Sequence, residues 1–195
     1  MAGGRSVGTA VADEPTPQEG PKVPPEAPRE TDRRRGARVE WLHKDSGQRF
    51  LGPKRWVWRD PDNHFKVNKI AMPPDARSYM PCVILRIKPL DKGVTFPMIV
   101  KYAEYRLRKL IDVDKVIENA PTTLPFENQG AHVLHVTGKI ERRGTPVECR
   151  QIVYLRGQWF TVIACGSALG DFGDHQVEFD ELISGITFDP PKPGR

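Results

Sequence analysis

Residues 131–188 read AHVLHVTGKI ERRGTPVECR QIVYLRGQWF TVIACGSALG DFGDHQVEFD ELISGITF, and this stretch decides the fold. Three long segments in it place apolar residues at every second position, as β-strands do. Turn sequences join them at Arg142-Arg143-Gly144 and at Arg156-Gly157-Gln158. The third segment, Trp159–Cys165, is apolar on both faces, which is typical of a covered central strand and predicts a buried Trp159. The stretch therefore predicts an antiparallel meander.

A helix is expected on each side of this meander. The downstream helix covers Gly173–Ser184, ends at Gly185 and directs Val177, Leu182 and Ile183 to the core. A short last strand follows it. The upstream helix begins after Thr95, and its apolar stripe consists of Ile99, Ala103, Leu107, Leu110 and Ile111.

The chain before the upstream helix predicts more strands. Residues 39–43 and 48–51 flank a turn with Gly47 and predict a hairpin. Residues 54–59 alternate and place Trp56 and Trp58 on one face, and residues 82–90 form another strand. Together these elements predict an α+β fold, in which an antiparallel sheet is flanked by helices in an α/β/α sandwich.

The first 36 residues differ in composition from the rest. They hold six prolines, no aromatic residue, and six basic against six acidic residues. Such a segment cannot bury enough apolar area to offset its ordering entropy, so we expect a disordered Pro-rich arm over residues 1–36. The folded domain then spans 37–188, and 189–195 is a Pro-rich tail. The net charge of +5 lies outside the arm, which favours an acidic partner or an anionic surface and is too weak to indicate nucleic acid.

Three cysteines, Cys82, Cys149 and Cys165, lie in apolar segments with strand character. An odd number without paired spacing is not a disulfide framework, so we expect buried free thiols. One disulfide, between Cys149 and Cys165, remains an alternative. A three-residue turn at Gly157 places Cys149 opposite Cys165, whereas a two-residue turn pairs Cys149 with Ala164 and puts the thiols on different faces.

No residue pattern indicates catalysis, a cofactor or a metal. The closest histidine pair, His132 and His135, falls on opposite faces of a strand and cannot share a metal ion by local geometry. His175 lies among acidic residues at the start of a predicted helix. Acidic side chains are favourable at this end of a helix because of the helix dipole, so capping explains their presence. No Ser-His-Asp order, Gly-rich phosphate loop or Cys-x-x-Cys pair occurs. We expect no catalytic residue and no bound cofactor or metal, and a hydrolase with dispersed catalytic residues stays open as an alternative.

Clusters of arginine are the candidate partner-binding residues. One cluster ends the Pro-rich arm, one lies beside the two tryptophans of the predicted strand 54–59, and one lies in a predicted hairpin loop. A solvated surface is the alternative explanation for each cluster, and a core position is the alternative for the tryptophans. The candidate residues are Arg33, Arg34, Arg35, Arg55, Arg59, Arg142 and Arg143.

The order of these elements resembles the PsbP-like domains, a group named for an extrinsic subunit of the photosystem II oxygen-evolving complex. The resemblance covers Trp41–Phe188 and is carried by Lys88-Pro89-Leu90-Asp91, by Gly157-Gln158-Trp159-Phe160-Thr161-Val162, and by Phe179–Phe188. The same fold occurs in a Ran-binding nuclear transport protein and in small bacterial proteins. The plant subunit arrives in the lumen with a targeting peptide, and this chain shows no such peptide, so we carry over the fold and the general role and no functional residue.

The resemblance implies a non-enzymatic accessory or assembly subunit that binds a larger, membrane-associated protein complex, such as a photosynthetic one. A soluble chaperone or adaptor that shields an apolar peptide is the alternative. No segment reaches the roughly 18 apolar residues that span a bilayer, and Met1–Ala12 lacks the apolar centre of a secretory signal. We therefore expect a cytoplasmic protein, with a peripheral membrane position left open.

Overall fold

The predicted meander forms the centre of the larger of two antiparallel sheets. The computed structural model describes residues 38–61, 67–76 and 80–189, all within one compact unit. The larger sheet has the strand order β3-β4-β5-β9-β8-β7-β6, and the smaller has the order β1-β2-β10. The elements are β1 Glu40–His43, β2 Gln48–Leu51, β3 Val57–Arg59, β4 Lys69–Met72, β5 Cys82–Pro89, α1 Phe96–Arg108, β6 Ile111–Pro121, β7 Gly130–Ile140, β8 Pro146–Arg156, β9 Trp159–Ala168, α2 Phe172–Ser184 and β10 Thr187–Phe188.

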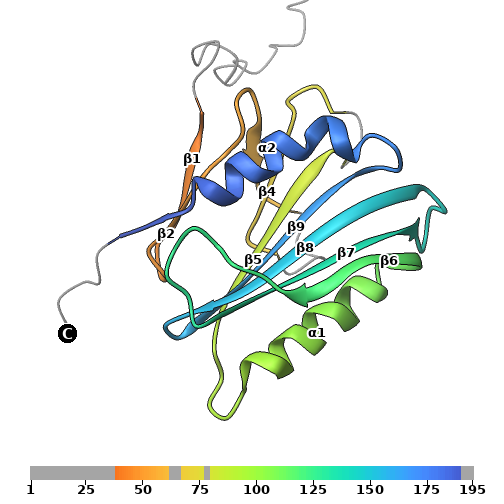
Figure 1. Ribbon diagram of the computed structural model, residues 1–195. Helices are drawn as coiled ribbons and strands as arrows, with labels where there is room; N and C mark the ends of the chain where they lie inside the picture. Colours follow the sequence, from red (N-terminus) through yellow and green to blue (C-terminus); the bar gives the residue numbers. More distant parts are fainter. Residues whose placement is uncertain (1–37, 62–66, 77–79, 190–195) are drawn as a thin grey trace, which may run out of the picture. The chain divides into compact units, whose positions relative to one another are not determined.

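The larger sheet separates two layers (Figure 1). Helix α1 lies on one face and buries Ile99, Ala103 and Leu107 against β6, β7 and β8. Helix α2 and the smaller sheet cover the other face. Because strand side chains alternate between the faces, a strand in the middle of the sheet is apolar on both sides. The α+β prediction is therefore confirmed.

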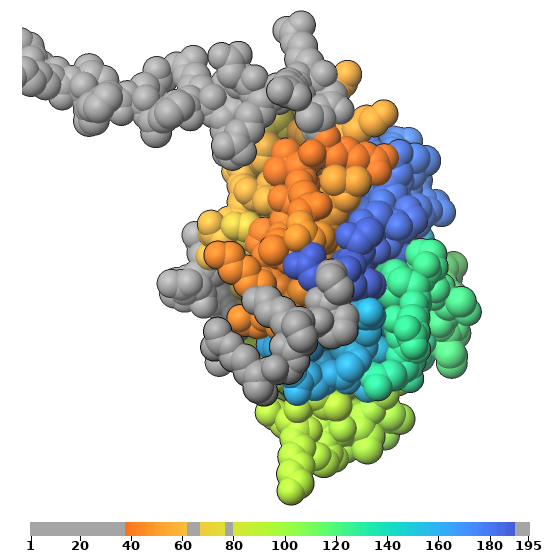
Figure 2. All heavy atoms as spheres, turned by 90° about the vertical axis from the view of Figure 1, so that its left-hand side faces the viewer, coloured from red at the N-terminus to blue at the C-terminus, as the bar shows by residue number. Residues whose placement is uncertain are grey.

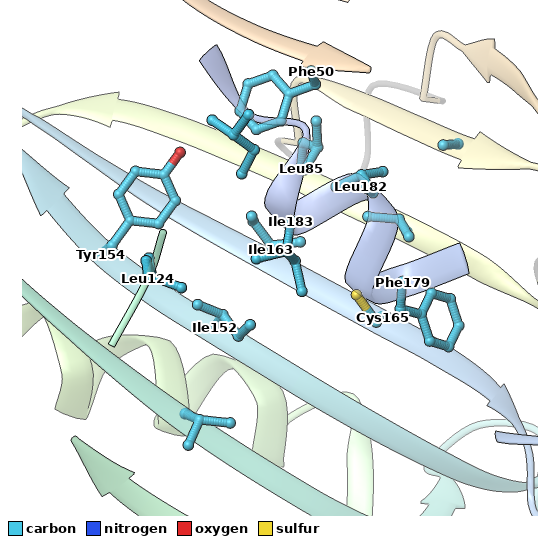
Figure 3. Packing of buried hydrophobic residues seen from close by; sticks show 14 of the residues in the cluster. Phe50, Leu85, Leu124, Ile152, Tyr154, Ile163, Cys165, Phe179, Leu182 and Ile183 are labelled. Atoms are coloured by element: carbon cyan, nitrogen blue, oxygen red, sulfur yellow. The ribbon is translucent and has the colours of Figure 1, made fainter. Parts of the chain in front are cut away.

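The largest core cluster lies between the larger sheet and α2 (Figure 3). Phe179, Leu182 and Ile183 point from α2 toward Ile163 on the central strand β9. Phe50 of β2 closes the same cluster and is fully buried. The smaller sheet is thus attached to the larger one by apolar packing, since no strand pairing joins them.

A buried polar contact also ties the two sheets together. Gln48 of β2 is almost fully buried, although it is polar. Its side-chain oxygen accepts hydrogen bonds from the Tyr154 hydroxyl at 2.6 Å and from the Thr161 hydroxyl at 2.9 Å. Both donors are themselves fully buried on β8 and β9. One amide oxygen therefore satisfies two hydroxyl groups that would otherwise be buried without an acceptor.

The register of the β8–β9 hairpin differs from both predicted alternatives. The turn has two residues, Gly157 and Gln158, and pairs Arg156 with Trp159. Cys149 then lies opposite Gly166, so its pairing with Ala164 or Cys165 was wrong. Cys82 also lies opposite Gly166, on the other side of β9. The prediction of buried free thiols is confirmed for all three cysteines.

Two side-chain placements, those of Val177 and Leu110, were wrong. Val177 is 68% exposed, because α2 begins at Phe172 and turns its Phe172–Phe179 face inward. Trp159 is the first residue of β9 and packs against the largest core cluster with part of its surface exposed, which agrees with a mostly buried position. Leu110 is exposed, because α1 ends at Arg108 before the apolar stripe is complete.

The tryptophan strand is shorter than predicted. Arg55 has a φ of 68°, a left-handed conformation that a strand does not allow, and β3 begins only at Val57. Trp56 is buried and Trp58 is partly buried, and both pack against the largest core cluster. The indole N–H of Trp58 donates to the Val39 carbonyl at 2.8 Å. Both tryptophans therefore belong to the core and do not form an exposed binding surface.

Candidate protein-interaction surface

The arginines predicted from the sequence do not form one surface. Arg33, Arg34 and Arg35 lie outside the described residues. Arg55 and Arg59 are exposed beside β3, where Arg59 donates a hydrogen bond to the Pro74 carbonyl at 3.0 Å. Arg142 and Arg143 are exposed in the β7–β8 turn. Strands β3 and β7 stand five positions apart in the sheet, which is roughly 24 Å at the usual strand spacing.

Two further arginines, Arg150 and Arg156 on β8, are held within the domain. The Arg150 guanidinium pairs with Asp180 of α2 at 2.5 Å and lies 5.9 Å from the Phe172 ring centroid. The Arg156 guanidinium stacks 3.8 Å from the Phe188 ring centroid. These two side chains fasten α2 and β10 to the sheet, so they are not a free basic surface.

A different surface emerges on the outer side of α1. The helix buries Ile99, Ala103 and Leu107, which are spaced by four residues. Met98, Tyr102 and Tyr105 follow the spacing i, i+4, i+7 and therefore share the opposite face. Their exposed fractions are 53%, 41% and 58%. Large apolar side chains in one continuous row on the outside of a helix have no role in the domain's own core.

Cations from two elements hold both tyrosine rings. Arg86 of β5 donates to the Tyr102 hydroxyl at 3.1 Å, and its guanidinium carbon lies 5.4 Å from the Tyr102 ring centroid. The Lys109 ammonium lies 5.6 Å from the Tyr105 ring centroid. Cation–π contacts of this kind are favourable and fix the orientation of the ring. The two rings are therefore held in place at the surface.

The charges around Tyr102 also change its acidity. Burial by itself would raise the pKa of the Tyr102 hydroxyl. The hydrogen bond from Arg86 and the positive charges of Arg86, Arg106 and Lys88 oppose this, and the net effect lowers its pKa. The three basic groups therefore lie close enough to Tyr102 to stabilise the ionised form of the same hydroxyl.

We call this surface the α1 outer patch. In Figure 2 the yellow-green segment that leads into α1 lies at the bottom of the view, below the orange β1–β2 hairpin. The acidic residue of the patch is Glu104, which pairs with Arg108 at 3.0 Å. The patch consists of Met98, Tyr102 and Tyr105 with the basic residues Arg86, Lys88, Lys101, Arg106, Arg108 and Lys109.

A cavity between α1 and strands β6–β8 has a volume of about 10 Å³, which is close to the space of a single water molecule and too small for a substrate. His132 lies at its wall and is hydrogen-bonded to Asn119 at 2.7 Å. Within the described ranges, no three His, Cys, Asp or Glu side chains are grouped to hold a metal ion. In the same part of the chain, neither helix is long and apolar enough to cross a membrane.

The three thiols and two of the histidines lie in structural surroundings. Burial raises the pKa of the Cys82 and Cys149 thiols to about 12 and raises that of Cys165 as well, so all three are protonated at neutral pH. Burial lowers the pKa of His43, which bonds the hydroxyl of Ser46 in the adjoining turn. His135 pairs with Glu148 at 2.8 Å. Each group has a structural partner or a buried position that accounts for it.

Sequence reasoning missed the α1 outer patch, although part of its signal was present. The spacing of Met98, Tyr102 and Tyr105 is a second apolar stripe on a helix whose inner stripe already buries Ile99, Ala103 and Leu107. That signal was available from the sequence. The contribution of Arg86 was not, because it comes from a strand and meets Tyr102 only in the folded domain.

Comparison with known proteins supports the fold. No family model matches the chain, and no curated protein matches it in sequence. The chain is similar to the solution structure of cyanobacterial PsbP (CyanoP) from Synechocystis, with a TM-score of 0.60 and 12% identity over 79% of this chain and 94% of that one. It is also similar to the crystal structure of LpqN, a protein involved in cell envelope biogenesis of Mycobacterium tuberculosis, with a TM-score of 0.58 and 12% identity over 78% and 91% of the two chains. The described domain thus has a PsbP-like fold.

Proposed function

We propose that this chain is a non-enzymatic accessory subunit that binds and stabilises a larger, membrane-associated protein complex. The observation that carries the proposal is the α1 outer patch. Tyr, Met and Arg are enriched in protein interfaces, and buried Tyr and Arg side chains supply much of the binding energy there. The PsbP-like fold and the small interior cavity agree with a role exercised through the surface. A photosynthetic complex is one assembly that fits the proposal.

The alternative of a chaperone that shields an apolar peptide in a groove of the sheet has less support. Helix α1 packs over β6–β9 on one face of the larger sheet, and α2 with β1, β2 and β10 packs on the other. The free edge strand β6 is interrupted by irregularities between Val113 and Lys115 and between Val116 and Glu118. Bulges of this kind protect an edge strand from pairing with another chain.

Recovery of the complex from the native source tests the proposed function. We expect the tagged full chain to co-purify with a partner complex in stoichiometric amount. Tyr102→Ala combined with Tyr105→Ala should weaken that association by about tenfold to a hundredfold, since the loss of aromatic anchors typically costs 2 kcal/mol or more. Quantitative mass spectrometry of the purified material provides the measurement.

Val177→Ala is the matched control, because Val177 is an exposed apolar side chain on the other helix. It should leave the amount of recovered partner unchanged. If the parent chain recovers no stoichiometric partner, the proposed function is wrong. If the partner is recovered equally with the double tyrosine variant, the function stands and the α1 outer patch is not its site.

We further propose that the arginine clusters assist the encounter with the partner. Arg55, Arg59, Arg142 and Arg143 are exposed at separate points of the domain, and Arg33-Arg34-Arg35 ends the Pro-rich arm. Exposed charges attract an oppositely charged partner as it approaches, over about 8 Å at physiological salt. Charges at the rim of an interface therefore change the association rate more than the dissociation rate.

Replacing Arg33, Arg34 and Arg35 together by Ala should slow association with the partner and leave the dissociation rate almost unchanged. The difference should shrink as salt is raised, because screening removes the steering. Surface plasmon resonance at two salt concentrations measures both rates. Equal association rates for the parent and the triple variant at low salt would contradict the steering role.

A further inference from the structure

The charge of the α1 outer patch points to the chemistry of its partner. Six basic residues surround the exposed row of Met98, Tyr102 and Tyr105. Glu104 is the acidic residue among them, and Arg108 already neutralises it at 3.0 Å. Opposite charges across an interface guide association and select the partner. We propose that the α1 outer patch binds an acidic segment of the partner protein, an inference that rests on the proposed function.

The hydrogen-bonding groups of the patch agree with a carboxylate-rich partner. Lys and Arg side chains are donors only, and a tyrosine hydroxyl can donate as well as accept. The Tyr102 hydroxyl already accepts from Arg86, which leaves its own hydrogen to donate outward. Carboxylates accept several hydrogen bonds and form the strongest contacts with guanidinium groups. An acidic segment would therefore match both the charge and the donors of the patch.

The same geometry disfavours nucleic acid as the occupant. Proteins that bind single strands stack bases on the faces of exposed aromatic rings. Here Arg86 lies over the Tyr102 ring and Lys109 lies over the Tyr105 ring, so a cation already occupies a face of each.

A lipid surface is disfavoured by the small apolar content of the patch. Interfacial membrane helices bury a broad apolar face, rich in Trp, Phe and Leu, between the lipid head groups. The outer side of α1 offers Met98 and two tyrosines, and one of the two phenol groups is fixed by Arg86. The row from Met98 to Lys109 extends about 16 Å along the helix axis, which suits a short peptide segment.

Titration of the isotope-labelled full chain with a designed peptide tests this inference. The probe is a synthetic peptide in which glutamates surround one phenylalanine, and its control has every Glu replaced by Gln. We expect the acidic peptide to shift the amide resonances of residues 98–109. We expect the Gln peptide to bind at least about tenfold more weakly, which corresponds to about 1.4 kcal/mol. Binding of the acidic peptide should weaken as salt rises.

Charge-reversal variants locate the effect. Lys101→Glu with Lys109→Glu should abolish binding of the acidic peptide. Lys44→Glu with Lys54→Glu makes the same change in net charge at exposed positions outside the patch and should leave the dissociation constant within about twofold. A circular dichroism spectrum of each variant verifies that the helices are intact.

Three outcomes would overturn the inference and leave the proposed function to be judged by recovery of the complex. The first is no binding of the acidic peptide at low salt, or shifts that lie away from α1. The second is equal binding of the acidic and Gln peptides. The third is that the chain binds vesicles of phosphatidylcholine and phosphatidylglycerol but not the acidic peptide, and that the Lys101/Lys109 variant no longer binds the vesicles. This result would assign the patch to a lipid surface.

Discussion

Replacing Phe179 by Ala is expected to lower the free energy of unfolding by about 3–5 kcal/mol, the range found for buried aromatic side chains. Phe179 is fully buried and lies where α2 meets the larger sheet (Figure 3). Its ring centroid lies 5.2 Å from that of Phe172 and 6.0 Å from that of Trp56. The substitution removes these ring contacts and leaves a cavity that neighbouring side chains can fill only partly.

Val177→Ala on the same helix is the matched control, and it should change stability by less than about 0.5 kcal/mol. The pair is informative because the sequence predicted Val177 as a core residue, whereas the structure exposes it. Urea unfolding followed by tryptophan fluorescence measures both variants. A larger loss of stability in Val177→Ala than in Phe179→Ala would mean that α2 packs through its other face.

The second large effect is expected at Gln48. Gln48→Leu preserves the size of the side chain and removes the acceptor that the Tyr154 and Thr161 hydroxyls share. Each buried hydroxyl left without an acceptor costs about 1–3 kcal/mol, so the loss of the acceptor for two hydroxyls should cost about 2–6 kcal/mol of stability. The loss arises where β2 contacts β8 and β9, and it should therefore loosen the smaller sheet from the larger one.

A triple variant separates this polar effect from packing. Gln48→Leu with Tyr154→Phe and Thr161→Val removes the donors together with the acceptor, so no buried polar group is left unpaired. We expect the triple variant to recover most of the stability that Gln48→Leu loses. If Gln48→Leu is as stable as the parent in denaturant unfolding, the shared acceptor does not stabilise the domain.

Elements with a local residue pattern were predictable from the sequence. The strands β7, β8 and β9 alternate over ten or eleven residues and are joined by turns with Gly144 and Gly157, so their order and direction were predictable. The inner face of α1 followed from its helical spacing for the same reason. The exact register did not follow, because one residue more or less in a turn exchanges the residues that face each other.

The ends of the strands and helices were less predictable, because contacts with neighbouring elements determine where each one starts and stops. Strand β6 runs from Ile111 to Pro121, since β7 supplies a hydrogen-bonding partner along its length. Gly138 of β7 lies opposite an irregular part of β6. A residue with a Cβ atom at position 138 would collide with the Asp112 carbonyl oxygen. Neither strand alone carries the information that sets this fit.

The burial of individual polar and aromatic side chains depends on how the elements pack in three dimensions. Gln48 belongs to a four-residue strand and looks like a solvated residue in the sequence, yet packing of β2 over β8 and β9 buries it. Tyr102 and Tyr105 are exposed because no element of the described domain covers the outer side of α1, and Arg86 reaches Tyr102 from a strand 16 residues away in the chain. Periodicity fixes which side chains share a face of one element, whereas the burial of that face depends on contacts between elements distant in sequence.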